Sequence, residues 1–213
     1  DGAHDEFKRQ LYALGEAPLP RFVGRESEPE DMEQFQCIFA KNEGAVTAPA
    51  AGLHFSRELM KLMEIKGIDF SFITLHCGLG NFRETDVEDL TKHKMDSEEV
   101  HVGAECCQMV NNAKENNRKV VAVGTTVQRA LEACVGTNHR IKEYDGWTNK
   151  FIFPPYEFNV ANAMVSNFHL PYSTLLMLTS AFGGYENTMN AYKVALQEDY
   201  RFGVYGDAML IID

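Results

Sequence analysis

Short apolar runs alternate with amphipathic segments along most of the chain, and this alternation predicts its secondary structure. Apolar or β-branched runs predict strands at residues 45–48, 70–75, 119–123, 151–153 and 163–165. Helical spacing of apolar residues predicts helices at residues 56–67, 104–117 and 126–135, from Ser173 to Gly183, and near Asn187. Strands separated by helices of this length predict an α/β fold with a mostly parallel sheet or a distorted barrel and flanking helices.

The amino-terminal region differs in character from the rest of the chain. Residues 15–31 are polar and contain prolines, whereas the strand and helix signals begin near Phe35. We therefore expect a lead-in or linker over residues 1–34 and one α/β domain over residues 35–213. The first ten residues lack both an initiator methionine and a signal-peptide pattern, so we expect a piece of a longer protein whose amino-terminal region is missing here. The longest apolar run, residues 175–182, is far shorter than the roughly 20 residues of a membrane helix, so no membrane partner is expected.

Composition narrows the choice of partners and compartment. The 213 residues are 45% hydrophobic and 24% charged, which suffices for one good core. The net charge of −11 argues against a general nucleic-acid binder, because phosphates are contacted by clustered Lys and Arg. Any nucleic acid must then be met by a local patch or by a missing segment. Five cysteines without CxxC spacing fit reduced thiols and a cytoplasmic location.

The segment SNFHLPYSTLLML, residues 166–178, carries the strongest chemical signal. It places Asn167 and His169 between an apolar strand and a helix that Ser173 or Thr174 can cap, and Pro171 prevents the strand from continuing. Polar residues at the carboxyl end of a strand are the usual ligand contacts of α/β sheets. The alternative is that His169 only satisfies a buried turn.

Two more histidines follow predicted strands. APAAGLHF brings His54 to the start of a helix, and TLHCGLGNF puts His76 at a strand end, followed by Gly78 and Gly80. Glycines there let a backbone approach a ligand, although a tight loop explains a lone GxG equally well. Three histidines at strand ends are harder to explain by packing alone.

A further segment, VAVGTT at residues 121–126, predicts an anion site. Thr125, Thr126 and Arg129 lie where free backbone N–H groups begin a helix, an arrangement that favours a carboxylate or a phosphate. The alternative is a plain Thr cap, with Arg129 paired to Glu132 or facing solvent. The loop HKMDSE adds Glu98 as a candidate carboxylate.

Taken together, these motifs resemble one family. APAAGLHF, TLHCGLGNF, HKMDSE, VAVGTT followed by RALE, SNFHLPYSTLLML, and YRFGVYGDAMLI at residues 200–211 are similar, in the same order, to S-adenosylmethionine:tRNA ribosyltransferase-isomerase of the queuosine pathway. The resemblance implies transfer of the ribosyl part of S-adenosylmethionine to the 7-aminomethyl-7-deazaguanine wobble base of tRNA, giving epoxyqueuosine, adenine and methionine. It implies S-adenosylmethionine and precursor-bearing tRNA as partners, and neither a metal nor a cofactor. A monomer is favoured, and the family's inserted β-barrel domain is largely absent from this chain.

The resemblance also implies roles for the candidate residues. The sulfonium acidifies the ribose 5′ carbon, and a general base with a pKa near neutral, typically imidazole, removes that proton. The expected catalytic residues are His54, His76, His169 and Glu98. The expected substrate-binding residues are Gly78, Gly80, Thr125, Thr126, Arg129, Asn167, Tyr205 and Asp207. Among these, Asn167 and Arg129 would hold an anion, and Glu98 or Asp207 would face the sulfonium.

Departures from the family pattern keep two other interpretations open. The chain differs from that pattern at Ala50, Cys77, Leu79, Asn81, Asp96, Val127, Gln128 and Pro155. One alternative is therefore a catalytically silent or divergent relative that binds tRNA or S-adenosylmethionine. The other is a metal-dependent hydrolase with His54, His76 and His169 as ligands, although the sequence lacks a His-x-His or HExxH signature.

Overall fold

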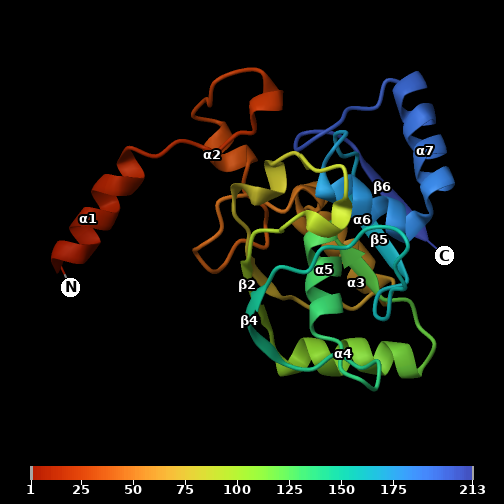
Figure 1. Ribbon diagram of the computed structural model, residues 1–213. Helices are drawn as coiled ribbons and strands as arrows, with labels where there is room; N and C mark the ends of the chain where they lie inside the picture. The colour runs from red at the N-terminus through yellow and green to blue at the C-terminus, as the bar shows by residue number, and fades with distance from the viewer. Residues whose placement is uncertain (1, 213) are drawn as a thin grey trace.

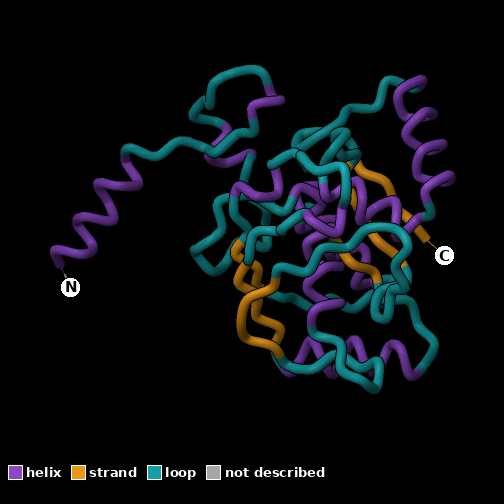
Figure 2. The backbone as a smooth tube through the Cα atoms, viewed as in Figure 1, coloured by secondary structure: helices purple, strands orange, loops and turns teal. Residues whose placement is uncertain are grey.

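The computed structural model describes residues 2–212 and contains two small sheets. In one sheet, β2 (Glu98–Val102) pairs antiparallel with both β1 (Thr74–His76) and β4 (Tyr144–Thr148). In the other, β5 (Ala163–Asn167) lies between β3 (Val121–Val123), which is parallel to it, and β6 (Ala208–Ile212), which is antiparallel. Figure 2 shows the strands in these two groups.

The α/β class is confirmed, but the strand pairing differs from the expected mostly parallel sheet. Among the described residues, β3 and β5 form the single parallel pair of strands. Strands β2, β4 and β6 were not predicted. Strand β2 alternates buried and exposed residues, as a half-covered antiparallel strand does. Its five residues are too few, and the flanking residues too charged, to indicate a strand from the sequence.

Two predicted strands are loops. Residues 45–48 do not form a ladder, because the N–H groups of Val46 and Thr47 both donate to one carbonyl, that of Cys77. Residues 151–153 are also irregular, and there the Phe151 and Phe153 rings pack on each other. Apolar side chains in both segments are thus used for local packing rather than for sheet pairing.

The predicted helices are confirmed. They are α3 (Arg57–Ile65), α4 (Ala104–Glu115), α5 (Thr125–Ala133), α6 (Thr174–Gly183) and α7 (Tyr185–Gln197). The hydroxyl oxygens of Ser56 and Ser173 accept hydrogen bonds from backbone N–H groups in the first turns of α3 and α6. Short 3-10 helices are η1 (Arg21–Val23), η2 (Ala50–His54), η3 (Leu79–Phe82) and η4 (Leu90–Lys92). Among the described residues, no helix has the length and apolar character needed to cross a membrane.

Helix α5 is central to the core. It packs against β1 on one side and against β3, β5 and α6 on the other, and Figure 1 shows it in the middle of the body with α4 below. Val100, Leu131 and Met164 meet in the main hydrophobic cluster, where each is at most 3% exposed. This packing fixes the ends of β3 and β5, where the candidate residues lie.

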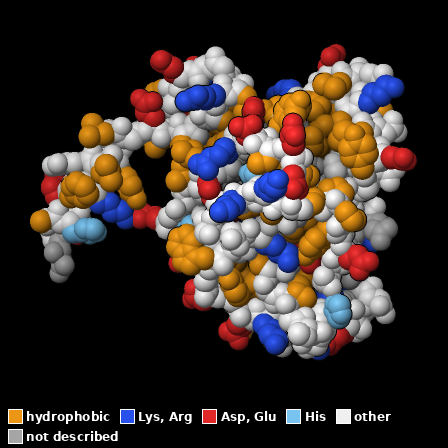
Figure 3. All heavy atoms as spheres, in the orientation of Figure 1, with side chains coloured by type: hydrophobic (Ala, Val, Ile, Leu, Met, Phe, Trp, Pro, Cys, Tyr) orange, Lys and Arg blue, Asp and Glu red, His pale blue; other side chains and the backbone are white. Residues whose placement is uncertain are grey.

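The amino-terminal segment has two parts. Helix α1 (Gly2–Ala13) was not predicted; it projects from the body, and its apolar side chains, including Phe7 and Leu11, are exposed (Figures 1 and 3). The following segment, which includes α2 (Asp31–Gln34), packs on the body because Ala17 and Phe35 share a buried cluster with Val204. The division at residue 34 stays a prediction, although these contacts tie the lead-in to the carboxyl-terminal loop.

Candidate active site at the ends of β3 and β5

The parallel pairing of β3 and β5 brings two of the predicted motifs together. Val123 lies opposite Val165 in this register, so the chain leaves both strands at the same edge, where Thr125 and Asn167 follow. Gly124 has a φ of 106°, which favours glycine, and its N–H donates to the Val165 carbonyl. A Cβ at Gly124 would lie 3.9 Å from the Cβ of Ala51, so η2 approaches the same edge.

A surface cavity of about 350 Å³ lies beside the carboxyl end of β5, where His54 contacts Asn167. Its wall combines the end of η2 with the loop that precedes β6. The residues that line it are Gln34, Leu53, His54, Arg201, Val204, Tyr205, Gly206 and Asp207. The cavity therefore joins an imidazole, a carboxylate, a guanidinium and a phenol from distant parts of the chain.

His54 is held in this cavity by Asn167. The His54 Nε2 atom lies 3.2 Å from the Asn167 Oδ1 atom, and the Asn167 side chain is 1% exposed. The Asn167 Nδ2 atom donates to the carbonyl of Gly203 at 3.0 Å and lies 3.4 Å from those of Val204 and Gly206. Both ends of the Asn167 amide are thus used in contacts within the protein, and an anion could bind it only by displacing them.

Asp207 and Arg201 form the charged side of the cavity. Asp207 accepts the backbone N–H of Arg201 at 2.7 Å, and its other oxygen lies 3.3 Å from the Arg201 guanidinium. These contacts, with a smaller contribution from His54, lower the pKa of the Asp207 carboxyl. Asp207 is thus an anion at neutral pH, and the Arg201 side chain, 76% exposed, leaves its cationic end accessible.

Tyr205 belongs to the cavity wall and is anchored from behind. Its hydroxyl donates to Asp31 at 2.8 Å, and Asp31 also accepts two hydrogen bonds from Arg25 and one from the Glu28 N–H. Burial, reinforced by Asp31, raises the pKa of Tyr205 to about 12, so the phenol stays protonated. The lead-in thereby fixes one wall of the cavity.

His169 does not reach this cavity. Its Nε2 atom lies 2.9 Å from the hydroxyl of Ser166, whereas His54 contacts Asn167, the next residue along β5. Successive side chains of a strand point to opposite faces, so the two histidines lie on opposite sides of the sheet. Burial lowers the pKa of His169 to about 4. These contacts fit the alternative in which His169 satisfies a buried turn.

His76 lies in the other sheet. It ends β1 as predicted, and its buried Nδ1 atom has no hydrogen-bond partner within residues 2–212. The ring packs so closely on Gly44 that a Cβ there would lie 2.5 Å from the Nδ1 atom. Of the two following glycines, Gly80 is contacted by the Asp96 carboxylate, whereas a side chain at Gly78 would meet open space. Neither glycine lines the cavity.

Glu98 and Arg129 are paired with each other in the interior. Each side chain is 4% exposed, and the other Glu98 oxygen accepts a hydrogen bond from Asn81 at 2.9 Å. Burial lowers the pKa of the Arg129 guanidinium. The alternative in which Arg129 pairs with Glu132 or faces solvent is therefore wrong. At the amino-terminal end of α5, Thr125 is buried and Thr126 is half-buried. Because Arg129 is paired with Glu98, it is not a free cation for the anion site predicted there.

The three candidate histidines therefore do not form one ligand set. His54, His76 and His169 contact Asn167, Gly44 and Ser166 respectively. In the part of the chain that the structure describes, no group of three His, Cys, Asp or Glu residues is arranged to hold a metal ion. The geometry removes the basis for the hydrolase interpretation, which required all three imidazoles at one point.

Two polar residues that line the cavity, Arg201 and Gln34, were not among the predicted site residues. Arg201 stands in the YRFGVYGD motif, and its cation next to the acidic residues Glu198 and Asp199 was a signal that could have been used. Gln34 lies in an acidic helix, and the sequence there gave no such signal.

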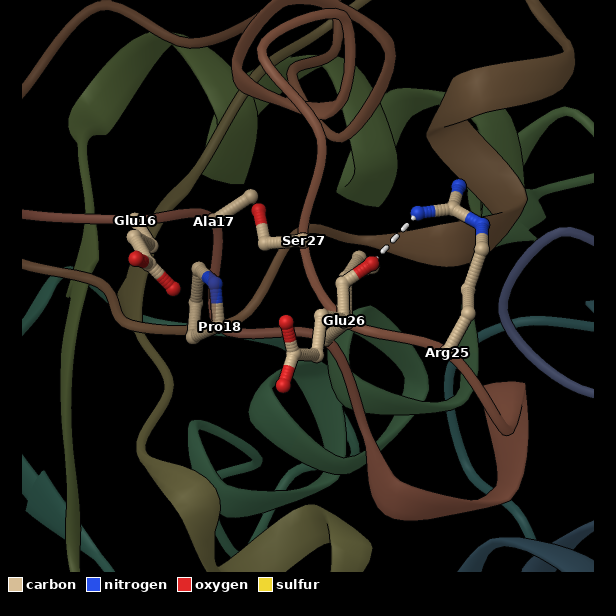
Figure 4. Close-up of a pocket in the computed structure, with 7 residues that line it drawn as sticks. Glu16, Ala17, Pro18, Arg25, Glu26 and Ser27 are labelled. Atoms are coloured by element: carbon tan, nitrogen blue, oxygen red, sulfur yellow. Dashed lines mark hydrogen bonds between the residues drawn. The ribbon is translucent and has the colours of Figure 1, made fainter.

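A second, wider depression is lined by residues 16–19 and 25–27 (Figure 4). There Arg25 is directed toward the Glu26 carbonyl and Asp31, so the Glu16 and Glu26 carboxylates dominate and the depression suits an anion poorly.

A sheet with helices packed on it and a cavity beside the carboxyl end of one of its parallel strands is the architecture of an α/β domain with a candidate ligand site. A family model described as queuosine biosynthesis protein matches residues 2–211, and the chain belongs to this family. The predicted resemblance is thus confirmed. The chain is 71% identical over 213 residues to the S-adenosylmethionine:tRNA ribosyltransferase-isomerase of Phocaeicola vulgatus, and 54% identical over 212 residues to that of Cytophaga hutchinsonii.

These alignments cover the whole of this chain but only part of each relative. The chain spans 61% of the length of both curated relatives. The crystal structure of S-adenosylmethionine tRNA ribosyltransferase from Thermotoga maritima matches with a TM-score of 0.64 and 40% identity, over 76% of this chain and 51% of that chain. The similarity therefore extends from sequence to fold within the shared part.

Proposed function

We propose that this chain is the carboxyl-terminal part of an S-adenosylmethionine-dependent tRNA ribosyltransferase-isomerase. It would move the ribosyl part of S-adenosylmethionine to the 7-aminomethyl-7-deazaguanine wobble base, with release of adenine and methionine. The observation that carries the proposal is the cavity beside the carboxyl end of β5, in which one imidazole and one carboxylate face the same space. Membership of the queuosine family supports the choice of substrates.

His54 is the proposed general base. The reaction needs a group that removes a proton from the ribose 5′ carbon beside the sulfonium, where the positive sulfur stabilises the electron pair that is left. His54 is the exposed imidazole of the three candidates, whereas His169 is neutral, half-buried and on the other side of the sheet. An imidazole that opens to the cavity suits proton removal near neutral pH.

The charged side chains suit the rest of S-adenosylmethionine. We assign Asp207 to the sulfonium, because its carboxylate stays ionised and lies beside His54 in the cavity. Arg201 carries an exposed guanidinium and suits the methionine carboxylate or a tRNA phosphate. The Tyr205 ring offers an aromatic surface to the sulfonium.

Transfer RNA must bind a chain whose net charge is −11. Figure 3 shows several Lys and Arg side chains on the face of the body seen in this view, and the exposed basic residues include Arg83 and Lys92. In this structure Arg83 is paired with Asp96 and Lys92 with Asp89. We propose that such exposed basic side chains exchange these carboxylates for tRNA phosphates in the cytoplasm, with a contribution from the part that the relatives have in addition. No metal or cofactor is assigned, since S-adenosylmethionine acts as a substrate.

The test is adenine release from S-adenosylmethionine in the presence of precursor-containing tRNA. This chain is compared with a version extended at the amino terminus to the length of the Phocaeicola vulgatus relative. We expect the extended protein to release adenine only when the tRNA is present, and His54→Ala to lose at least 100-fold in rate, on the order of general-base catalysis. His139→Ala is the matched control, because His139 is exposed, contacts Asn159 and does not line the cavity.

Two outcomes would contradict the proposal in different ways. Retained activity in His54→Ala together with loss in His169→Ala would move the base to the other side of the sheet. Binding of S-adenosylmethionine without adenine release by a folded, extended protein would instead identify a catalytically silent relative.

A further inference from the structure

We propose that Asn167 is a positioning residue for His54: its amide holds the His54 proton on Nε2 and leaves Nδ1 as the atom that accepts a proton in the cavity. The role as a base rests on the proposed function, whereas the state of the ring does not. The buried Asn167 amide contacts His54 at one end and the Gly203 carbonyl at the other.

The orientation of the Asn167 amide follows from the chemistry of its neighbours. One end of the side chain faces three backbone carbonyls, those of Gly203, Val204 and Gly206, at 3.0 to 3.4 Å. Carbonyl oxygens only accept hydrogen bonds, so this end must be the NH₂ group. The reversed amide would put an oxygen against three oxygens in a site that is 1% exposed, at a large cost for unpaired buried polar groups.

The other end of the amide is therefore an oxygen, which only accepts. It lies 3.2 Å from the Nε2 atom of His54, so Nε2 must carry the proton in this contact. In the neutral ring the lone pair then resides on Nδ1. Within residues 2–212, Nδ1 of His54 has no hydrogen-bond donor or acceptor of its own, and the ring is exposed on the cavity side.

Asn167 thus connects the base to the wall that shapes the site. The carbonyls it binds belong to the loop 203–206, and Val204 and Gly206 line the same cavity as His54. Asn167 pairs with Ala208 of β6 and is 1% exposed, so its backbone position is fixed for both contacts. A shift of this amide would change the direction of Nδ1 and the cavity wall together.

The charged and titratable groups around His54 are few. Asp207 and Arg201 face it from the segment before β6, and Tyr205 completes that side, with its hydroxyl bound to Asp31. The neutral Gln34 lines the side formed by α2. Substitution of Asn167 leaves all of them in place, so an effect on the His54 ring can be assigned to the amide.

The first experiment is nitrogen NMR of the histidine rings in the 213-residue chain. We expect His54 to show Nδ1 at the chemical shift of an unprotonated ring nitrogen and Nε2 at that of a protonated one. We also expect the Nε2 proton to be seen directly, because its hydrogen bond to Asn167 slows exchange with water. A neutral His54 with its proton on Nδ1 in the unmodified chain would overturn the proposal, and this result needs no variant to fold.

Two variants at Asn167 should move the His54 titration in opposite directions. Asn167→Asp places a carboxylate against the ring and favours the imidazolium, so its titration midpoint should rise by about one unit or more. Asn167→Ala removes the acceptor, so the midpoint should fall and the Nε2 proton signal should disappear. The matched control is Ser166→Ala, which alters the adjacent buried residue and its contact with His169. Equal effects of all three variants on His54 would reduce Asn167 to a packing role.

The same variants separate this proposal from the proposed function. In the extended protein, Asn167→Asp should shift the acidic limb of kcat/KM to higher pH, whereas Ser166→Ala should leave its position unchanged. If the NMR results hold and adenine is never released, the ring is positioned as described and the reaction is a different one. If adenine is released while His54 carries its proton on Nδ1, the function stands and the positioning proposal is wrong.

Discussion

Glu98 and Arg129 form an ion pair in which both side chains are 4% exposed. Strand β2 supplies the carboxylate and α5 the guanidinium, so the pair joins the antiparallel sheet to the central helix. Asn81 completes the carboxylate's contacts. The sequence motifs that suggested two separate substrate contacts thus converge on one internal structural link.

Breaking this pair should be strongly destabilising. Glu98→Gln or Arg129→Gln leaves one charge buried without its partner, and we expect each to lower the free energy of unfolding by roughly 3–5 kcal/mol. The double variant should lose less than the sum of the two, because no unpaired charge remains. Urea unfolding measures these differences.

The exposed pair Arg83–Asp96 is the matched control for that measurement. Its side chains are 68% and 46% exposed, so Asp96→Asn should change the free energy of unfolding by less than about 1 kcal/mol. A small effect of Glu98→Gln, comparable with that of Asp96→Asn, would show that the interior pair is open to solvent.

Asp31 should make the attachment of the lead-in depend on pH. The Arg25 hydrogen bonds, followed by the Glu28 N–H, lower the pKa of Asp31 well below its usual range. The folded pKa is lower than the unfolded value of about 4, so this stabilisation is present above pH 4 and is lost as the pH falls further. We expect Asp31→Asn to be less stable than the unmodified chain at pH 7 and to approach it near pH 2, as followed by urea unfolding. A constant difference across this range would contradict the role of the ionised carboxylate, and Asp86→Asn, at an exposed position, serves as control.

The sequence predicted the helices and the strand-end motifs because these depend on local signals. Ser56 and Ser173 lie at the amino-terminal ends of α3 and α6, as expected from their positions before apolar runs. Strands were also predicted near residues 119–123 and 163–165, and their parallel pairing in the structure brings Thr125 and Asn167 to one edge. Caps and apolar periodicity are written in consecutive residues.

Long-range pairing could not be predicted in the same way. The partner of Arg129 is Glu98, 31 residues earlier, rather than Glu132, which lies one helical turn away. The separation of His54 from His169 follows from the alternation of Ser166 and Asn167 on β5, which requires the strand bounds to be known to one residue. Arg201 joins the cavity only because β6 returns antiparallel to β5, a pairing that its short apolar run does not specify.

Glu132 should act as the anchor of the loop that follows β4. Its carboxylate, 3% exposed, accepts hydrogen bonds from the Tyr156 hydroxyl, from the N–H groups of Asn159 and Val160, and from the Asn159 amide. Glu132→Gln keeps the shape but turns an NH₂ group toward donors, so we expect a loss of about 1–3 kcal/mol in the free energy of unfolding. Proteolysis should then cleave first within residues 150–160, whereas Glu157→Gln, on the exposed side of the same loop, should leave the cleavage pattern unchanged.

His169 should make the chain less stable as the pH falls below neutrality, in a range distinct from that of Asp31. Burial lowers the pKa of the folded imidazole to about 4, whereas the unfolded imidazole titrates near 6.5. Between these values the unfolded chain binds a proton that the folded chain does not, so the free energy of unfolding decreases as the pH falls through this window. Between pH 8 and pH 5 we expect a loss of about 1–2 kcal/mol, which His169→Gln should largely remove. His139→Gln, at an exposed position, should keep the pH dependence of the unmodified chain. If His169→Gln keeps it too, the His169 ring is solvated and able to take up a proton, which would return it to the candidates for the general base.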